Sequence, residues 1–206
     1  SKQTGWIIIS AMWLGSTVIS VMYLQNVAQA SWTLKMWEKT FLLSMVPLIF
    51  LFSLLLIGGL FSLIGRFGIV AGKFPRTLAH PIYALRRIYG TAWTQIFYFK
   101  PLYAVCLALP TLKKFLFRLF GYRGQSDFIL YPDAWIRDLP MLRIGEGAYL
   151  ANRCTVGTNL CLNDGSILVG ECTFGDHSMV GHLCIFGLGC KLGRGSETGV
   201  AVALGI

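Results

Sequence analysis

The stretch that decides the fold runs from Ile144 to Ile206 and reads IGEGAY LANRCT VGTNLC LNDGSI LVGECT FGDHSM VGHLCI FGLGCK LGRGSE TGVAVA LGI. Cut into sixes, it has a large apolar residue first in ten of eleven sextets and a glycine second in eight of eleven. The fifth position is small except at Leu160 and Val202. An amphipathic helix repeats every three or four residues and a half-buried strand every two, so neither explains a period of six.

A period of six is typical of a hexapeptide β-helix. We expect each sextet to form one flat face and three faces to close a triangular coil, with the first and fifth side chains pointing inward. Glycine at the second position is expected to ease the turn, because glycine tolerates a positive φ. The frame stops inside a sextet, so the coil is expected to be incomplete at its C-terminal end. A free thiol in the fifth position behaves as a small hydrophobe, and that position holds Cys154, Cys172, Cys184 and Cys190.

The chain is too apolar for an ordinary soluble domain. The whole chain is 55% hydrophobic, and uncharged runs cover Trp6–Val27 and residues 40–65. Each run is long enough to cross a bilayer, which takes about 20 residues. A cleaved signal peptide would be shorter, and no second apolar run would follow it at once. Residues 1–66 are therefore predicted to form two transmembrane helices.

Positive charge is concentrated in the middle of the chain. Ten basic residues and no acidic residue lie between Arg66 and Arg123. Positive segments beside membrane spans stay in the cytoplasm. Both the N-terminus and everything after Gly65 are therefore expected on the cytoplasmic, stromal or matrix side. Because this basic segment adjoins membrane spans, anionic lipid headgroups are the expected partner, and nucleic acid is not.

The basic segment, residues 67–123, mixes aromatic, aliphatic and charged residues. Its uncharged part, Pro101–Leu112, is too short to cross a membrane. Lys113, Lys114 and Arg118 recur among apolar residues at helical spacing. This pattern predicts helices lying in the membrane interface, with basic side chains reaching lipid phosphates. The alternative is that these helices pack on their own domain.

The order of these segments resembles a known family. Leu116–Gly157, LFRLFGYRGQSDFILYPDAWIRDLPMLRIGEGAYLANRCTVG, with the spans before it and the sextets after it, resembles membrane-bound hexapeptide-repeat acyltransferases. It is similar to the C-terminal membrane region of polylysine-synthetase-type proteins. The resemblance implies a left-handed parallel β-helix over residues 124–206. It also implies acetyl-CoA or another acyl thioester as co-substrate, and a groove between subunits of a homotrimer as the site.

The candidate catalytic residues are His182 and His177, at the third and fourth positions of neighbouring sextets. Both positions are expected to face outward, as a groove requires. An imidazole there would remove a proton from the acceptor hydroxyl or amine, and Asp176 or Asp164 could orient it. The alternative is that both are exposed histidines without chemistry. In the resembling family a histidine precedes an Asp-Gly segment, and this chain has Leu160 near that position. No cofactor-binding residue is identified.

A metal site is not expected. Trimeric β-helical carbonic anhydrases share zinc between subunits through three histidines, two of which stand five apart, as His177 and His182 do. The next histidine slot of that pattern holds Gly187 here, and the remaining histidine is His80, a predicted turn residue. None of the six cysteines forms a CxxC pair, so neither a zinc ribbon nor a disulfide framework is indicated.

Two functions remain open from the sequence. One is a membrane-bound acyltransferase that moves an acyl group from a thioester to a hydroxyl or amine. The other is a non-catalytic β-helical accessory or assembly subunit of a larger membrane complex.

Overall fold

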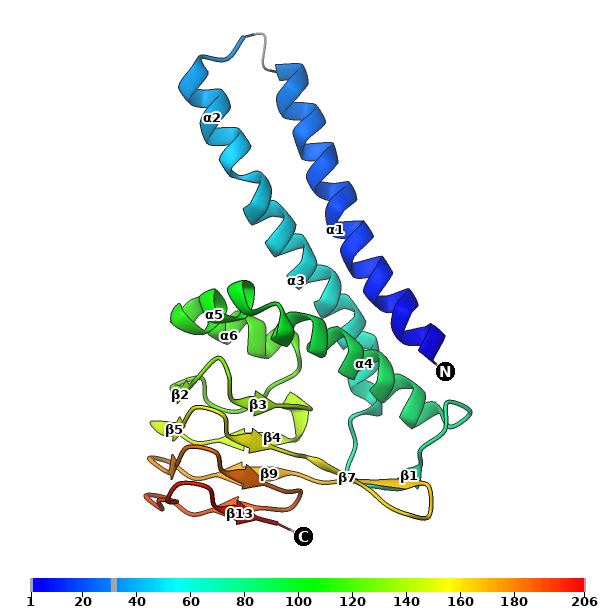
Figure 1. Ribbon diagram of the computed structural model, residues 1–206, viewed down its shortest axis with the longest axis vertical. Helices are drawn as coiled ribbons and strands as arrows, with labels where there is room; N and C mark the ends of the chain where they lie inside the picture. The colour runs from blue at the N-terminus through cyan, green and yellow to red at the C-terminus, as the bar shows by residue number, and fades with distance from the viewer. Residues whose placement is uncertain (1, 31–32, 206) are drawn as a thin grey trace.

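The computed structural model describes residues 2–30 and 33–205. It has three parts, stacked along its long axis: a helical hairpin, a layer of shorter helices and a stack of strands that ends at the C-terminus (Figure 1). The helical hairpin consists of α1 (Lys2–Ala30), α2 (Met36–Ser44) and α3 (Val46–Gly65). The helical layer consists of α4 (Pro81–Tyr98), α5 (Lys100–Ala108) and α6 (Pro110–Leu119).

The helical hairpin agrees with the prediction of two apolar N-terminal helices. By length and composition, Gln3–Ala30 and Met36–Gly68 are each long and apolar enough to cross a membrane. The second of these bends between α2 and α3, where Pro47 lies in the first turn of α3. Proline tolerates the first turn of a helix, where its missing N–H has no intrahelical partner.

Short strands follow the helices. They are β2 (Phe128–Leu130), β3 (Trp135–Ile136), β4 (Leu142–Ile144), β5 (Ala148–Leu150), β6 (Thr155–Val156), β9 (Cys172–Phe174), β10 (Met179–Val180), β11 (Ile185–Phe186), β12 (Lys191–Leu192) and β13 (Ala203–Leu204). A separate antiparallel sheet holds β1 (Gly72–Pro75), β8 (Ser166–Val169) and β7 (Asn159–Cys161).

The ten strands from β2 to β13 outside that antiparallel sheet form three parallel sheets. Their orders are β2-β5-β10, β3-β6-β11-β13 and β4-β9-β12, so the chain visits the three sheets in turn. Leu130 lies opposite Leu150 in the first sheet, and both are buried. We call residues 128–204, without the antiparallel excursion, the three-sheet coil. Parallel strands and an inward-facing first residue in each coil sextet were both predicted.

The three-sheet coil begins earlier than the six-residue frame. Its first turn runs from Phe128 to Ile144, before the first sextet. Leu130 and Ile136 are six residues apart, but the next inward residue, Ile144, comes eight later. Asp138 takes a left-handed conformation (φ 52°) and a short 3-10 turn, Leu139–Met141, follows it. These two extra residues hide the period from the sequence.

A segment of twelve residues, Asn159–Gly170, leaves the three-sheet coil. This segment forms the hairpin of β7 and β8, and β1 pairs with β8 on its other side. The chain departs at Thr158 and returns at Gly170, whose N–H donates to the Thr158 carbonyl at 2.9 Å. The excursion is twelve residues long, which is two sextets, so the frame passes through it unchanged. The prediction that residues 159–170 belong to the coil is therefore wrong, whereas Cys172 and Thr173 do lie in coil strand β9.

The second-position glycines also have a different role from the predicted one. The left-handed residues lie at the fourth position, for example Gly147 and His177. A Cβ on Gly145 would overlap the backbone of Asp176 in the next turn of the coil. Glycine is therefore needed for close stacking of successive turns at Gly145, Gly175 and Gly181. Gly157, at the same position of another sextet, has room for a Cβ, and Gly205 is a second-position glycine with a positive φ.

The helical layer covers the first turn of the three-sheet coil. Trp93 donates its indole N–H to the Ile136 carbonyl at 2.7 Å. Lys113 donates to the Phe128 carbonyl at 2.6 Å and Lys100 to the Pro132 carbonyl at 2.7 Å. Lys113 is therefore directed at the coil, and the packing alternative holds for this face. One hydrophobic core runs from the helical hairpin through the helical layer into the coil.

Candidate functional site

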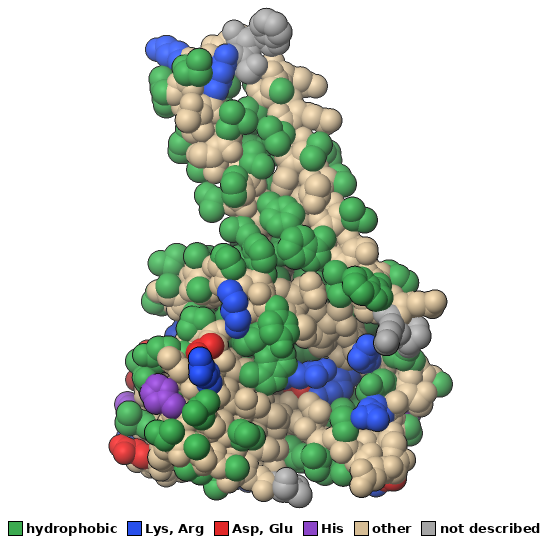
Figure 2. Space-filling view, in the orientation of Figure 1, with side chains coloured by type: hydrophobic (Ala, Val, Ile, Leu, Met, Phe, Trp, Pro, Cys, Tyr) green, Lys and Arg blue, Asp and Glu red, His purple; other side chains and the backbone are tan. Residues whose placement is uncertain are grey.

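Both predicted catalytic histidines lie on the outer surface of the three-sheet coil. His177 follows β9 and His182 follows β10, so each stands at a corner between two sheets. Both residues are exposed. The histidines in view in Figure 2 likewise lie on the outside of the coil. Their outward orientation agrees with their positions in the sextet.

The structure does not join the two histidines into one site, because they stand at different corners. The His177 ring lies over Gly147 of the preceding turn of the coil. Among residues 2–30 and 33–205, no side-chain hydrogen bond of the His177 or the His182 imidazole is found. Each imidazole could therefore act only by itself or with a group from another molecule.

The carboxylates considered as partners for the imidazoles are bound elsewhere. Asp176 accepts a hydrogen bond from the Glu146 N–H at 3.0 Å. Asp164 lies at the tip of the β7–β8 hairpin, where it pairs with Lys73 at 2.6 Å. Hydrogen bonds from Lys73 and Ser166 hold the pKa of Asp164 well below its usual value. Neither carboxylate orients an imidazole within this chain.

The coil cysteines are packing groups. Cys154, Cys172 and Cys184 are buried in the fifth, inward position, and Cys190 is half-buried. Burial raises the pKa of Cys154 to about 12 and the pKa of Cys172 to about 11. Because the thiolate is the reactive form, such thiols are poor nucleophiles at neutral pH.

The remaining histidine does not complete a metal site. His80 occupies the N-cap position of α4 without a capping side-chain hydrogen bond, and its ring stacks on Phe74 at 5.9 Å between ring centroids. It therefore has the structural role expected of a residue before Pro81. In the described parts of the chain, no group of three or more His, Cys, Asp or Glu side chains could hold a metal ion.

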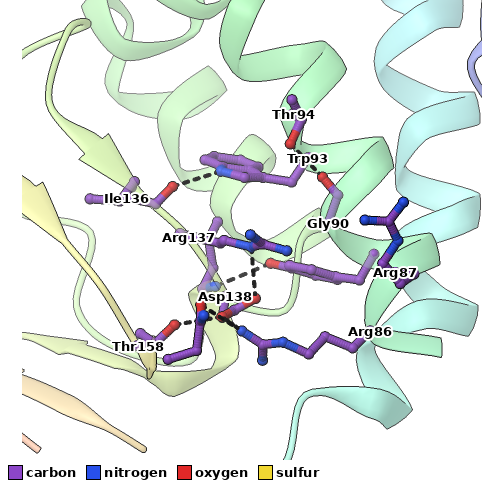
Figure 3. Close-up of polar contacts among 12 residues, drawn as sticks. Arg86, Arg87, Gly90, Trp93, Thr94, Ile136, Arg137, Asp138 and Thr158 are labelled. Atoms are coloured by element: carbon purple, nitrogen blue, oxygen red, sulfur yellow. Dashed lines mark hydrogen bonds and ion pairs between the residues drawn. The ribbon is translucent and has the colours of Figure 1, made fainter. Parts of the chain in front are cut away.

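A buried ion pair joins the helical layer to the three-sheet coil, and no pattern in the sequence predicted it. Arg86 of α4 pairs with Asp138 of the first turn, and each residue is at most 1% exposed (Figure 3). Thr158 donates to the same carboxylate at 2.5 Å, and Arg86 donates to the Asn159 side-chain oxygen at 3.0 Å. Burial lowers the pKa of Arg86, and the charge of Asp138 opposes that effect.

This cluster is structural rather than catalytic. No substrate could reach the Asp138 carboxylate, which is fully buried. Tyr89 closes the cluster by accepting from the Leu139 N–H at 3.1 Å and donating to the Phe120 carbonyl at 2.9 Å. Burial, with the nearby Asp138 charge, raises the pKa of Tyr89 well above its usual value.

An open cleft lies close by, at the junction of the three parts of the molecule. It has a volume of about 430 Å³ and lies between the end of α3, the end of α6 and the first turns of the coil. Four arginines and one glutamate provide its charged lining: Arg66, Arg118, Arg123, Arg143 and Glu171. We call this the arginine cleft. The charge count of the sequence had indicated a basic segment. It had not indicated that Arg66 and Arg143, which are 77 residues apart, would line one cleft.

Comparisons with known proteins leave the function to be argued from the structure. No protein-family model, no curated protein and no solved structure matches this chain. The resemblance to hexapeptide-repeat acyltransferases therefore stays a prediction.

Proposed function

We propose that this protein is a membrane-bound acyltransferase whose three-sheet coil is a left-handed β-helix. It moves an acetyl or longer acyl group from coenzyme A, or another thioester carrier, to a hydroxyl or amine acceptor. One observation carries the proposal: His182 has an exposed imidazole at a corner of the three-sheet coil. This coil is fixed beneath the two apolar helices. That arrangement holds one base at a constant distance from the membrane surface.

The reaction needs one base that later acts as an acid. The His182 imidazole takes the proton from the acceptor O–H or N–H, and the freed oxygen or nitrogen attacks the thioester carbonyl carbon. The new bond to carbon forms as the carbon–sulfur bond breaks. The leaving thiolate then takes the proton from the imidazolium, so the base returns to its starting state.

A second copy of the chain would complete the site. The coil surface beside His182 carries three exposed apolar side chains, Met179, Leu183 and Ile185, which are 45–55% exposed. Neighbouring exposed apolar side chains of this kind favour a protein contact. A homotrimer packed through this surface would form a groove next to His182.

The membrane placement is part of the same proposal. The two apolar helices cross the bilayer, and the basic residues from Arg66 onward hold the helical layer and the coil on the cytoplasmic, stromal or matrix side. The acceptor is then a molecule presented at that membrane surface.

The test is acyl transfer by purified protein in proteoliposomes, followed as release of free thiol from acetyl-CoA and longer acyl thioesters. His182→Gln is expected to lower turnover by about 10²- to 10⁴-fold, the usual contribution of a positioned general base. His177→Asn, which tolerates the left-handed backbone at that corner, tests the second candidate. Arg153→Gln, at an exposed corner of the preceding turn, is the matched control.

The alternative is an accessory or assembly subunit without catalysis. The observation that favours this alternative is that neither the His177 nor the His182 imidazole has a carboxylate partner in this chain. In that case the wild-type protein releases thiol only at the background rate, and His182→Gln does not change that rate. Native mass spectrometry of the detergent-extracted assembly would then find one copy bound to unrelated subunits in place of three copies of this chain.

A further inference from the structure

The arginine cleft carries unbalanced positive charge. Arg143 pairs with Glu171 at 3.1 Å, which neutralises one of its four arginines. Arg118 donates only to the carbonyls of Tyr122 and Gly124 and keeps its charge. In the described part of the chain, the guanidinium groups of Arg66 and Arg123 make no ion pair and no hydrogen bond. Four positive charges and one negative charge leave the cleft at +3.

The position of the arginine cleft is at the end of an apolar helix. Arg66 directly follows α3, and Phe67 beside it is 69% exposed. An exposed aromatic next to a basic residue is typical of a membrane interface. A ligand of this cleft would therefore meet lipid on one side and water on the other.

A second hollow lies further along α3, in the apolar part of the molecule. It has a volume of about 680 Å³ and lies between α3, α5 and α6. Leu48 and Phe52 of α3, Val105 of α5 and Leu112 of α6 are among its lining residues. We call it the apolar groove. Among its described lining residues none is charged, so only hydrocarbon suits it.

The apolar groove and the arginine cleft follow one another along α3. Leu48, Phe52 and Leu55, which line the groove, are spaced by four and three residues and so share one face of the helix. Arg66 lies eleven residues after Leu55, which is about three helical turns, and therefore falls on the same side. Arg118 and Leu112 are one to two turns apart on α6. Both helices thus line the groove with apolar residues and the cleft with arginine.

We propose that the arginine cleft binds the phosphate of an anionic membrane lipid whose acyl chain lies in the apolar groove. The inference uses the membrane placement proposed above and does not depend on acyl transfer. A phosphomonoester headgroup fits the cleft best, because it carries about 1.5 to 2 negative charges at pH 7, compared with one on a phosphodiester. Arginine guanidinium groups bind phosphate oxygens through paired hydrogen bonds.

The experiment measures lipid binding by the full chain in detergent micelles, by native mass spectrometry and by microscale thermophoresis. The lipid probes are phosphatidic acid, which has a phosphomonoester, and phosphatidylglycerol and phosphatidylcholine, which have phosphodiesters. Inorganic phosphate and coenzyme A are the soluble phosphate probes. Phosphatidic acid is expected to bind most tightly and phosphatidylcholine least, with neither soluble probe displacing phosphatidic acid at equal concentration.

Two sets of variants test the two halves of the site. Arg66→Gln and Arg123→Gln together should weaken phosphatidic acid binding by about 100-fold, since each charge-assisted hydrogen bond contributes about tenfold or more. The matched control is Lys114→Gln with Arg87→Gln, which removes two exposed charges outside the cleft and should change affinity by less than about threefold. Val105→Trp fills the apolar groove and should weaken binding of long-chain but not dihexanoyl phosphatidic acid.

Four results would overturn the proposal. Equal affinities for phosphatidic acid and phosphatidylcholine would remove phosphate recognition. An equal loss in the Lys114/Arg87 control would mean diffuse attraction in place of a site. Displacement of the lipid by coenzyme A or inorganic phosphate would assign the cleft to a soluble phosphate. If Val105→Trp bound long-chain phosphatidic acid as tightly as the wild type, the acyl chain would not lie in the apolar groove. Acyl-transfer activity can be lost or kept in any of these results, so this test is independent of the proposed reaction.

Discussion

At the scale of single residues, Asp138 links the helical layer to the coil. It has a left-handed backbone, a fully buried carboxylate and partners from α4 and from the second turn of the coil. A buried charge is tolerated only when it is paired and hydrogen-bonded. Asp138 therefore fixes how the helical layer sits on the coil.

Replacing Asp138 with asparagine should destabilise the protein strongly. Asparagine tolerates the left-handed backbone, so the change removes the charge and leaves the buried Arg86 unpaired. The free energy of unfolding should fall by about 3–5 kcal/mol, measured by denaturant unfolding in detergent.

The matched control for this change is Asp164→Asn, which breaks the Lys73–Asp164 pair, where both side chains are about half exposed. An exposed pair contributes about 0–1 kcal/mol, so little change is expected there. Similar losses in both variants would contradict the structural role of the buried pair.

The second-position glycines give another prediction at this scale. Gly145→Ala should lower the free energy of unfolding by about 1–3 kcal/mol, because the new Cβ would overlap the backbone of Asp176. Gly157→Ala occupies the same slot of another sextet, where the nearest atom would be 3.6 Å away. That variant should be neutral or slightly stabilising. Thermal unfolding that ranks the two variants in the opposite order would disprove the stacking role.

At the scale of elements, the β7–β8 hairpin is an insertion that the coil does not need. Removing Asn159–Gly170 would join Thr158 to Glu171 and restore one sextet, Val156-Gly157-Thr158-Glu171-Cys172-Thr173, before Phe174. The frame itself could not reveal the insertion, because an excursion of two full sextets leaves the period unchanged.

This twelve-residue deletion should leave a folded coil. It removes the partner strand of β1 and the small cluster of Phe74, Ile167 and Val169. The free energy of unfolding should therefore fall by about 2–4 kcal/mol. A nine-residue deletion of Asn159–Ile167 breaks the period and should abolish the coil. Far-UV circular dichroism and limited proteolysis compare them. If both deletion variants were unfolded to the same extent, the coil would need the hairpin in order to fold.

At the scale of the whole molecule, the helical layer connects a membrane-sized hairpin to the coil without a flexible linker. Trp93 bonds to the first turn of the coil, and its ring packs on Phe120 at 5.1 Å between centroids. Movement of the helical hairpin would therefore carry the coil with it. If the hairpin crosses a membrane, the whole coil lies on one side.

The sidedness of the coil can be tested with its own thiols. Cys161 in the β7–β8 hairpin is exposed, whereas the other five cysteines are buried or half-buried. A membrane-impermeant maleimide should label Cys161 in inverted vesicles but not in right-side-out vesicles, and Cys161→Ser should remove the signal. Adding Lys35→Cys to Cys161→Ser should reverse the pattern, since Lys35 lies at the far end of the helical hairpin. Labelling of Cys161 in sealed right-side-out vesicles would contradict the predicted orientation.

The sequence by itself determined the features that repeat locally. A period of six predicted parallel strands with inward first and fifth residues, and two long uncharged runs predicted the two apolar helices, because these patterns report only which side chains must avoid water. The outward orientation of His177 and His182 followed from the same frame.

Only the tertiary structure decided which distant groups meet. Arg86 and Asp138 are 52 residues apart, and the arginine cleft draws its charges from the end of α3, the end of α6 and the coil. Periodicity contains no information on which helix covers the first turn of the coil, on an insertion of two whole sextets, or on the stacking distance that requires glycine. These features depend on packing between elements, and that packing is fixed only when the whole chain folds around its shared core.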